Sequence, residues 1–295
     1  MILTVTLNPA LDLTYAVPAL VPGATHRVDG VASRPGGKGV NVARVLHALG
    51  EPVVAAGLAG GGTGARLRAE LAAAGIEEAF TPIAGETRRT VVVAAPTGAT
   101  GFWEPGPEVT AGEWAAFLAG YPALVRRAAL VVLAGSLPRG VPADAYARLV
   151  EVARAAGAAT ILDADGPALR HGLAAGPDLV KPNADELAGL GAPPQRLGAR
   201  DVVSSHGEAG LVASTSAGSW TAALARPLPG NATGAGDACV AALARGVVRA
   251  QPWPERLVDA VALSAAAVTS PVAGEIELDE WRRLRAHVSV LPRRP

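Results

Sequence analysis

The chain has 295 residues, half of them hydrophobic, which is enough for one large α/β domain or two small ones. Its formal net charge is zero, which argues against a basic surface for nucleic acid. The single cysteine, Cys239, excludes a disulfide framework and a cysteine-rich zinc site, and its apolar surroundings predict a buried thiol.

Neither the start of the chain nor its apolar runs predict a membrane segment. Residues 2–7 lack the basic start and the cleavage site of a signal peptide. The longest apolar run, 257–273, contains Asp259 and is shorter than the ~20 residues of a typical membrane span. We therefore expect a cytoplasmic protein that binds neither membranes nor nucleic acid.

In chain order, short β-branched runs alternate with helical patterns. Buried strands are predicted at 2–7, 53–59, 130–134, 160–165, 178–180, 202–205 and 211–213. Helices are predicted at 40–49, 64–74, 143–156, 238–244, 255–269 and 278–287. This alternation predicts an α/β fold in three layers, with helices on both faces of a mostly parallel sheet.

Two segments, 13–34 and 87–108, interrupt this rhythm with prolines, glycines and more polar strands. Strands are expected at 14–17, 26–31 and 87–94, and together they predict a small β lid over the core. The α/β core then consists of 1–12, 35–86 and 109–295. Within the lid, Arg88 and Arg89 point to opposite faces of a strand, so one of them could reach a bound phosphate. The alternative is that both are solvated surface charges.

Lysine and asparagine are rare in this chain, so the few that occur are candidates for chemistry. They are Lys38, Lys181, Asn8, Asn41, Asn183 and Asn231. Asn8 and Asp12 follow the first strand, and ligands of open α/β sheets collect at the carboxyl ends of strands. Asp12 could accept hydrogen bonds from two sugar hydroxyls, or it could simply be a turn residue.

The first glycine-rich stretch, 36–41, leads into a helix but matches neither the P-loop nor the dinucleotide-binding pattern. Gly36 and Gly37 would let a ligand approach the backbone. Lys38 adds a cation, and the amide of Asn41 can exchange hydrogen bonds with a hydroxyl group.

The second glycine-rich stretch, 233–237, precedes a run of small apolar residues. Backbone N–H groups at a helix N-terminus form an anion site, and the carboxylate of Asp237 follows directly. A base beside an anion site indicates phosphoryl transfer. The alternative for Asp237 is an N-cap without a catalytic role.

Together these stretches resemble the PfkB (ribokinase-like) carbohydrate kinase family over nearly the whole chain. The resemblance lies in residues 36–43, 183–186 and 231–244. Residues 8–12, Lys38, Thr87-Arg88 and 135–138 are similar to the phosphosugar branch, which comprises 1-phosphofructokinase, the PfkB type of 6-phosphofructokinase and tagatose-6-phosphate kinase.

The resemblance implies an ATP- and Mg²⁺-dependent kinase of a ketohexose phosphate, such as fructose 1-phosphate, fructose 6-phosphate or tagatose 6-phosphate. Asp237 would be the general base, with the N–H groups of Gly234, Ala235 and Gly236 as anion hole. The substrate residues would be Asp12, Gly37 and Asn41 for the hydroxyls and Lys38, Arg88 and Ser136 for the phosphate. The nucleotide residues would be Lys181, Asn183, Ser205, Gly207, Gly210, Thr233 and Gly236. Asn183 and Glu186 would organise Mg²⁺ through water, and the β lid would form a homodimer contact.

The chain departs from the family pattern at several positions. Ala232 replaces a larger residue of the second signature, and Thr90 and Val92 stand where 1-phosphofructokinases usually have asparagine and lysine. Asp165 and His206 are also unusual for the family. The departures at Thr90 and Val92 bear on which phosphosugar is the substrate. Two alternatives to a phosphosugar kinase also stay open: a kinase of an unphosphorylated sugar or nucleoside, and a non-catalytic sugar-phosphate binder.

Overall fold

The structure, a computed structural model, describes residues 1–28, 30–226, 228–230, 232–270 and 275–293. Three predictions reach beyond these limits in part. Asn231 of the second signature, residue 29 of the expected strand 26–31 and the end of the apolar run 257–273 lie outside the described residues.

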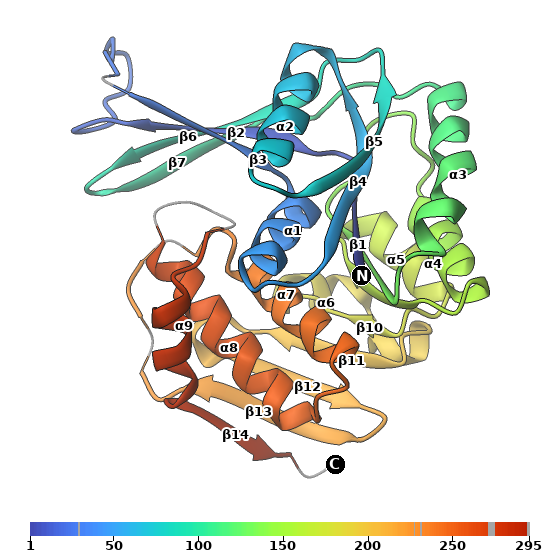
Figure 1. The fold of residues 1–295 in the computed structure, drawn as a ribbon. Coiled ribbons are helices and arrows are strands. Elements are labelled where there is room, and N and C mark those ends of the chain that lie inside the picture. The colour runs from blue at the N-terminus through green and yellow to red at the C-terminus, as the bar shows by residue number, and fades with distance from the viewer. Residues whose placement is uncertain (29, 227, 231, 271–274, 294–295) are drawn as a thin grey trace.

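Within the described residues, a ten-stranded sheet runs through the centre of the molecule (Figure 1). Its order is β14-β13-β12-β11-β10-β9-β8-β1-β4-β5. The strands from β11 to β5 are parallel. They are β1 (Ile2–Thr6), β4 (Val53–Gly60), β5 (Glu77–Ile83), β8 (Leu130–Ala134), β9 (Ala159–Asp163), β10 (Leu179–Val180) and β11 (Asp201–Ser205).

Three antiparallel strands extend this sheet at one end. They are β12 (Leu211–Thr215), β13 (Gly218–Leu224) and β14 (Val288–Pro292). The sequence predicted the first of them but not the other two.

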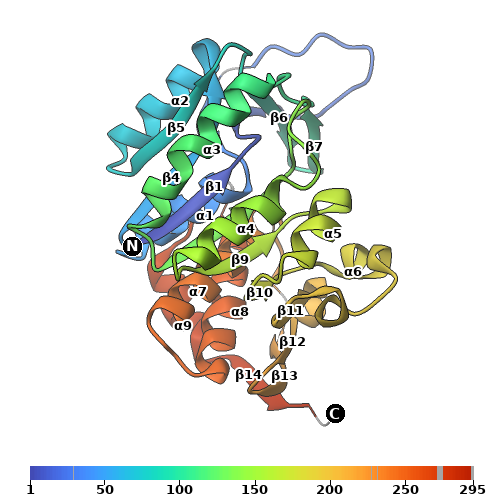
Figure 2. The same cartoon turned by 90° about the vertical axis from the view of Figure 1, so that its right-hand side faces the viewer.

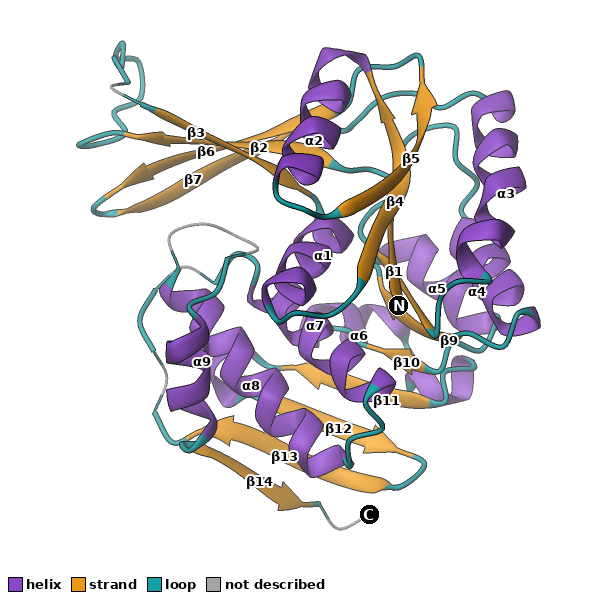
Figure 3. Ribbon diagram, viewed as in Figure 1, coloured by secondary structure: helices purple, strands orange, loops and turns teal. Residues whose placement is uncertain are grey.

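Helices cover both faces of the large sheet, which confirms the predicted three layers (Figure 3). One face packs against α1 (Lys38–Ala48), α2 (Gly61–Ala73), α7 (Ala235–Val248), α8 (Trp253–Thr269) and α9 (Leu278–Arg285). The other face packs against α3 (Ala111–Val125), α4 (Ala145–Ala155), α5 (Gly166–Ala174) and α6 (Ala184–Leu190). Figure 2 shows α3, α4 and α5 in front of the central strands. Two 3-10 turns, η1 (Pro194–Leu197) and η2 (Gly207–Ala209), complete the fold. No described helix is long and apolar enough to cross a membrane.

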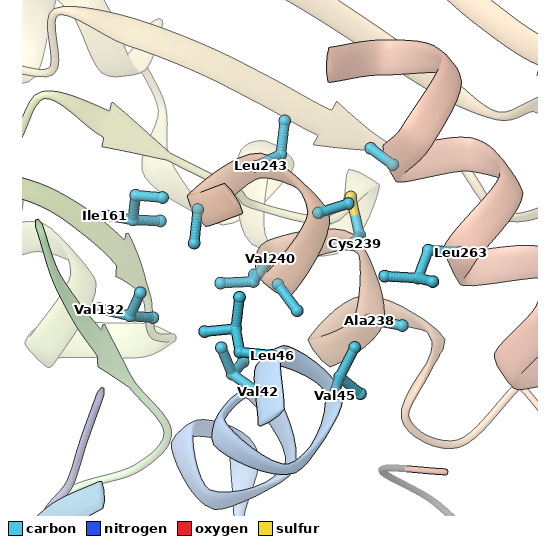
Figure 4. Packing of buried hydrophobic residues seen from close by; sticks show 14 of the residues in the cluster. Val42, Val45, Leu46, Val132, Ile161, Ala238, Cys239, Val240, Leu243 and Leu263 are labelled. Atoms are coloured by element: carbon cyan, nitrogen blue, oxygen red, sulfur yellow. The ribbon is translucent and has the colours of Figure 1, made fainter. Parts of the chain in front are cut away.

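The helices α1 and α7, which begin at the two glycine-rich stretches, pack against each other in the core (Figure 4). Val42 and Leu46 of α1 and Val240 of α7 are completely buried. Burying each such side chain contributes about 1.5–3 kcal/mol to folding. Cys239 is buried in the same cluster, as predicted, and burial raises the pKa of its thiol to about 11. This packing fixes the two glycine-rich helix starts relative to each other.

A second sheet of four strands, in the order β3-β2-β6-β7, projects from the large one (Figure 1). Its strands are β2 (Ala10–Ala16), β3 (Val31–Gly36), β6 (Arg88–Ala95) and β7 (Gly98–Trp103). The small sheet was expected, but the strand predicted at 26–31 is wrong, because the residues that pair with β2 are 31–36. The register places Asp12 between Arg34 and Thr90, so these three side chains share one face.

Candidate active site

A cavity of about 700 Å³ lies where the small sheet meets the carboxyl ends of the parallel strands. All but three of the predicted site residues line it: Asp12, Gly37, Lys38, Asn41, Arg88, Ser136, Lys181, Asn183, Glu186, Ser205, Thr233, Gly234, Gly236 and Asp237. Residues almost 200 positions apart in the chain therefore share one site. The cavity is within the size range typical of small-molecule sites.

Asp237 stands in the first turn of α7, at the floor of this cavity. The N-cap of α7 is Gly234, whose φ of 85° lies in the left-handed region that glycine favours. Asp237 is therefore the third residue of the helix and not its N-cap, so the N-cap alternative is wrong. Its carboxylate accepts a hydrogen bond from Asn41 Nδ2 at 2.8 Å.

The surroundings of Asp237 make it a base suited to neutral pH. Burial and the neighbouring carboxylate of Asp163 raise its pKa to about 7, against the lowering effect of Asn41, Lys38 and Lys181. A general base is most effective when its pKa lies near the working pH.

Asp163, at the end of β9, is a site residue that the sequence reasoning missed. It is buried, and its Oδ1 lies 3.2 Å from Lys38 Nζ and 3.6 Å from Lys181 Nζ. Lys38 Nζ is also 3.9 Å from Glu186 Oε1. Burial alone would lower the pKa of Lys38, but the carboxylates around it raise the pKa above its ordinary value. The only two lysines of the chain thus meet at one carboxylate.

The predicted metal residues, Asn183 and Glu186, form a capping box at the start of α6. Asn183 Oδ1 accepts from the Glu186 N–H, and Glu186 Oε2 accepts from the Asn183 N–H, both at 2.8 Å. The single side-chain oxygen of Asn183 and one of the two carboxylate oxygens of Glu186 therefore take part in the cap. The remaining oxygen of Glu186 faces Lys38.

The small sheet contributes Asp12 and Arg88 to the opposite wall. A Cβ at Gly36 would overlap the Asp12 carboxylate, so glycine is needed beside it. Burial raises the pKa of Asp12, and the hydrogen bond from Thr90 and the charge of Arg88 oppose this rise. Gly37, with a φ of 96°, lets the chain pass within contact distance of Pro9.

Arg88 faces the cavity, whereas Arg89 faces away from it. Arg88 donates to the backbone carbonyl oxygens of Asn8, at 3.2 Å, and Glu104, at 3.3 Å. Arg89 is half-exposed and pairs with the Glu104 carboxylate at 3.1 Å. The alternation of the strand therefore separates one cavity-facing cation from one surface ion pair.

Three predicted residues do not line the cavity. The N–H of Ala235 donates to the Ala232 carbonyl, so this group of the predicted anion hole is already used. Gly207 and Gly210 lie at η2, beyond Ser205, where a Cβ at Gly210 would overlap the backbone of Ala222. The unusual His206 has a local role, because its Nε2 lies 2.8 Å from Ser204 Oγ.

Comparison with known proteins gives consistent findings. A model of the family described as pfkB family carbohydrate kinase matches residues 5–280. Phosphofructokinase-2 from Escherichia coli, solved in complex with potassium, is 28% identical with a TM-score of 0.88, over 97% of this chain and 98% of that chain. A possible 1-phosphofructokinase from Thermotoga maritima is 27% identical with a TM-score of 0.90, over 99% of each chain. Ribokinase from Arabidopsis thaliana, complexed with ribose and ATP, is 20% identical with a TM-score of 0.72, over 96% of this chain and 98% of that chain, which is a likeness of fold alone.

Proposed function

The chain belongs to the pfkB family of carbohydrate kinases, and from this membership and the cavity we propose that it transfers the γ-phosphoryl group of ATP to a hydroxyl of a ketohexose phosphate. One observation carries the proposal. A buried carboxylate in the first turn of a helix, Asp237, lines the same cavity as Arg88, a cation of the small sheet that donates hydrogen bonds to the backbone carbonyls of Asn8 and Glu104.

Asp237 accepts the proton of the substrate hydroxyl, whose oxygen forms a bond to the γ-phosphorus as the bond to ADP breaks. The first N–H groups of a helix have no intrahelical partner, so those at the start of α7 stabilise the charge on the transferred group. Gly234 and Gly236 belong to this anion hole. Asn41 orients the base through its 2.8 Å hydrogen bond.

Arg88 and Ser136 bind the phosphate that the substrate already carries. Arg88 donates hydrogen bonds to two neutral backbone carbonyls and is attracted by the charges of Asp12 and Glu104. Its guanidinium has further N–H groups that can donate to an anion. Asp12 and Thr90, side by side on the small sheet, receive the sugar hydroxyls. The resemblance implied that Lys38 binds the substrate phosphate as well. Because Lys38 pairs with Asp163 at 3.2 Å and interacts with the charge of Asp237, we assign it to the transferred phosphoryl group instead.

The nucleotide occupies the end of the cavity formed by Lys181, Asn183, Ser205 and Thr233. The described donors at this end of the cavity could supply only one or two protein ligands to Mg²⁺. The described residues contain no group of three or more metal ligands, so no protein cage encloses the ion. Mg²⁺ usually keeps several waters and binds one or two carboxylates with substrate phosphates, and Glu186 and Asn183 would hold it in that manner. When bound, the ion neutralises charge on the ATP phosphates.

The outer face of the small sheet suits a second copy of this chain. The strand register places Leu13, Val91 and Phe102 on the face opposite Asp12 and Thr90, and the side chain of Phe102 is 58% exposed. Such an apolar sheet face is typical of an interface. We expect a homodimer through the β lid, and Phe102→Asp should yield a monomer in sedimentation velocity. A monomeric wild type would contradict this arrangement.

The activity is tested by ADP release with Mg-ATP over a panel of acceptors: fructose 1-phosphate, fructose 6-phosphate, tagatose 6-phosphate, fructose, ribose and adenosine. We expect turnover of one phosphosugar and none of the free compounds. Turnover of a free compound alone would show that the enzyme is a kinase of an unphosphorylated substrate. No turnover of any acceptor, with a phosphosugar bound in calorimetry, would indicate a non-catalytic binder.

A further inference from the structure

The side chain of Asn8, at the end of β1, connects three separate segments of the cavity wall. Its Nδ2 donates to Pro105 O at 3.2 Å and to Ser136 Oγ at 3.1 Å, while the backbone carbonyl oxygen of the same residue accepts from Arg88 Nε at 3.2 Å. The side chain is 5% exposed and borders the cavity. Asn8 therefore touches both groups that we assign to the phosphate of the substrate.

The orientation of the Asn8 amide follows from its partners. Pro105 O can only accept a hydrogen bond, so the amide nitrogen and not the oxygen must face it. The second hydrogen on that nitrogen points to Ser136 Oγ, which accepts it. The hydroxyl hydrogen of Ser136 is then free to donate to another acceptor.

The same amide supports the guanidinium of Arg88 indirectly, through the segment of Glu104 and Pro105. Arg88 Nη1 donates to Glu104 O, and Glu104 is next to Pro105, which Asn8 anchors. A Cβ at Gly106 would overlap Asn8 Oδ1, so the chain needs glycine to approach the amide this closely. The Asn8 side chain thus contacts Ser136 directly and anchors the segment that accepts the second hydrogen bond of Arg88.

We propose that Asn8 is the positioning residue of the substrate-phosphate subsite, acting through Ser136 and Arg88. This inference rests on the proposed function. Asn8 makes Ser136 a hydrogen-bond donor and fixes the segment that holds Arg88. It does not itself contact the reacting atoms.

The test compares Asn8→Ala, Ser136→Ala and the double variant, with the phosphosugar that the wild type phosphorylates. A hydrogen bond to a charged group is worth tenfold or more in binding, so each single variant should raise the KM for the phosphosugar about tenfold and leave the KM for ATP within about twofold. Because Asn8 acts partly through Ser136, the double variant should fall well short of the roughly hundredfold product. Thr4→Val, in the buried part of the same strand, should change neither KM.

An unchanged KM for the phosphosugar in Asn8→Ala would overturn the inference. So would an equal rise of both KM values, which indicates general loosening of the site, or a full hundredfold rise in the double variant. If Asn8→Ala does not fold, Gly106→Ala displaces the same amide, and an unchanged phosphosugar KM in that folded variant would also overturn the inference. A wild type that phosphorylates no phosphosugar would instead refute the proposed function, and this inference with it.

Discussion

Replacing Asp237 with asparagine should lower activity and raise stability at the same time. The substitution keeps the shape of the side chain, and Asn41 Nδ2 can still donate to the new amide oxygen. It removes the group that we propose as general base, and a general base typically contributes ~10²–10⁴-fold to the rate. We therefore expect kcat to fall by that factor in a coupled ADP assay at pH 8.

The stability effect follows from the pKa of Asp237, which folding raises from 3.8 to about 7. The folded protein holds this proton more tightly than the unfolded chain does. The free-energy cost of keeping Asp237 ionised in the folded state is therefore absent below about pH 4, where the carboxyl group is protonated in both states. The cost grows between the two pKa values and is complete above pH 7. About three pH units at ~1.4 kcal/mol each give a cost on the order of 4 kcal/mol.

Asp237→Asn should therefore unfold with a free energy about 2 kcal/mol above that of the wild type near pH 5.5 and about 4 kcal/mol above it at pH 8. Chemical denaturation at the two pH values measures this difference. Asp279→Asn, which removes a fully exposed carboxylate, serves as the control and should show no such dependence. Turnover within about threefold of the wild type would refute the role as base, and a pH-independent stability difference would refute the buried-charge argument.

Three further results are expected. The kcat/KM of the wild type should fall about tenfold for each pH unit below about 7, because Asp237 must be ionised to accept a proton; a flat profile from pH 5.5 to 8 would contradict this. Glu186→Gln should raise the Mg²⁺ concentration that gives half-maximal rate about tenfold or more. Phosphosugar binding, measured by calorimetry in the absence of ATP, should not change. An unchanged Mg²⁺ requirement would remove Glu186 from the metal site. Tyr146→Phe deletes a buried hydrogen bond of 2.9 Å to Gly135 O and should lower the free energy of unfolding by about 1–2 kcal/mol in urea denaturation, whereas no loss would show that this bond is not stabilising.

The parallel part of the fold could be predicted because its strands are buried on both faces. Strands such as β4 and β8 are continuous apolar runs, and their signal does not depend on the rest of the molecule. The glycine-rich helix starts were equally visible, since few residues tolerate the backbone conformation of Gly37 or Gly234.

The strands that sequence reasoning misplaced or missed owe their existence to their partners. Residues 31–36 contain Arg34, Pro35 and Gly36, a loop-like composition, and they form β3 only because β2 pairs with them. The edge strand β5 begins with two glutamates and contains Pro82, so its local signal was weak. The helix α3 was not predicted, although the capping box of Thr110 and Glu113 marks its start in the sequence.

Site residues within a sequence motif could be predicted, whereas residues that only the tertiary fold brings into the site could not. Asp163 belongs to no glycine-rich stretch, and its importance appears once Lys38 and Lys181 converge on it. Its position at the carboxyl end of a buried strand was the one available signal. Asn8 was recognised as a polar residue near a substrate, but its hydrogen bonds to two other segments depend on the tertiary fold.

The central claim is that this kinase recognises a phosphate already present on its sugar. The most direct measurement is kcat/KM for the preferred phosphosugar and for the same sugar without phosphate, in the wild type and in Arg88→Ala. We predict that the wild type favours the phosphosugar by a large factor. We also predict that Arg88→Ala loses at least tenfold on the phosphosugar and almost nothing on the free sugar. Equal values for the two sugars in the wild type, or an equal loss on both in Arg88→Ala, would contradict the account.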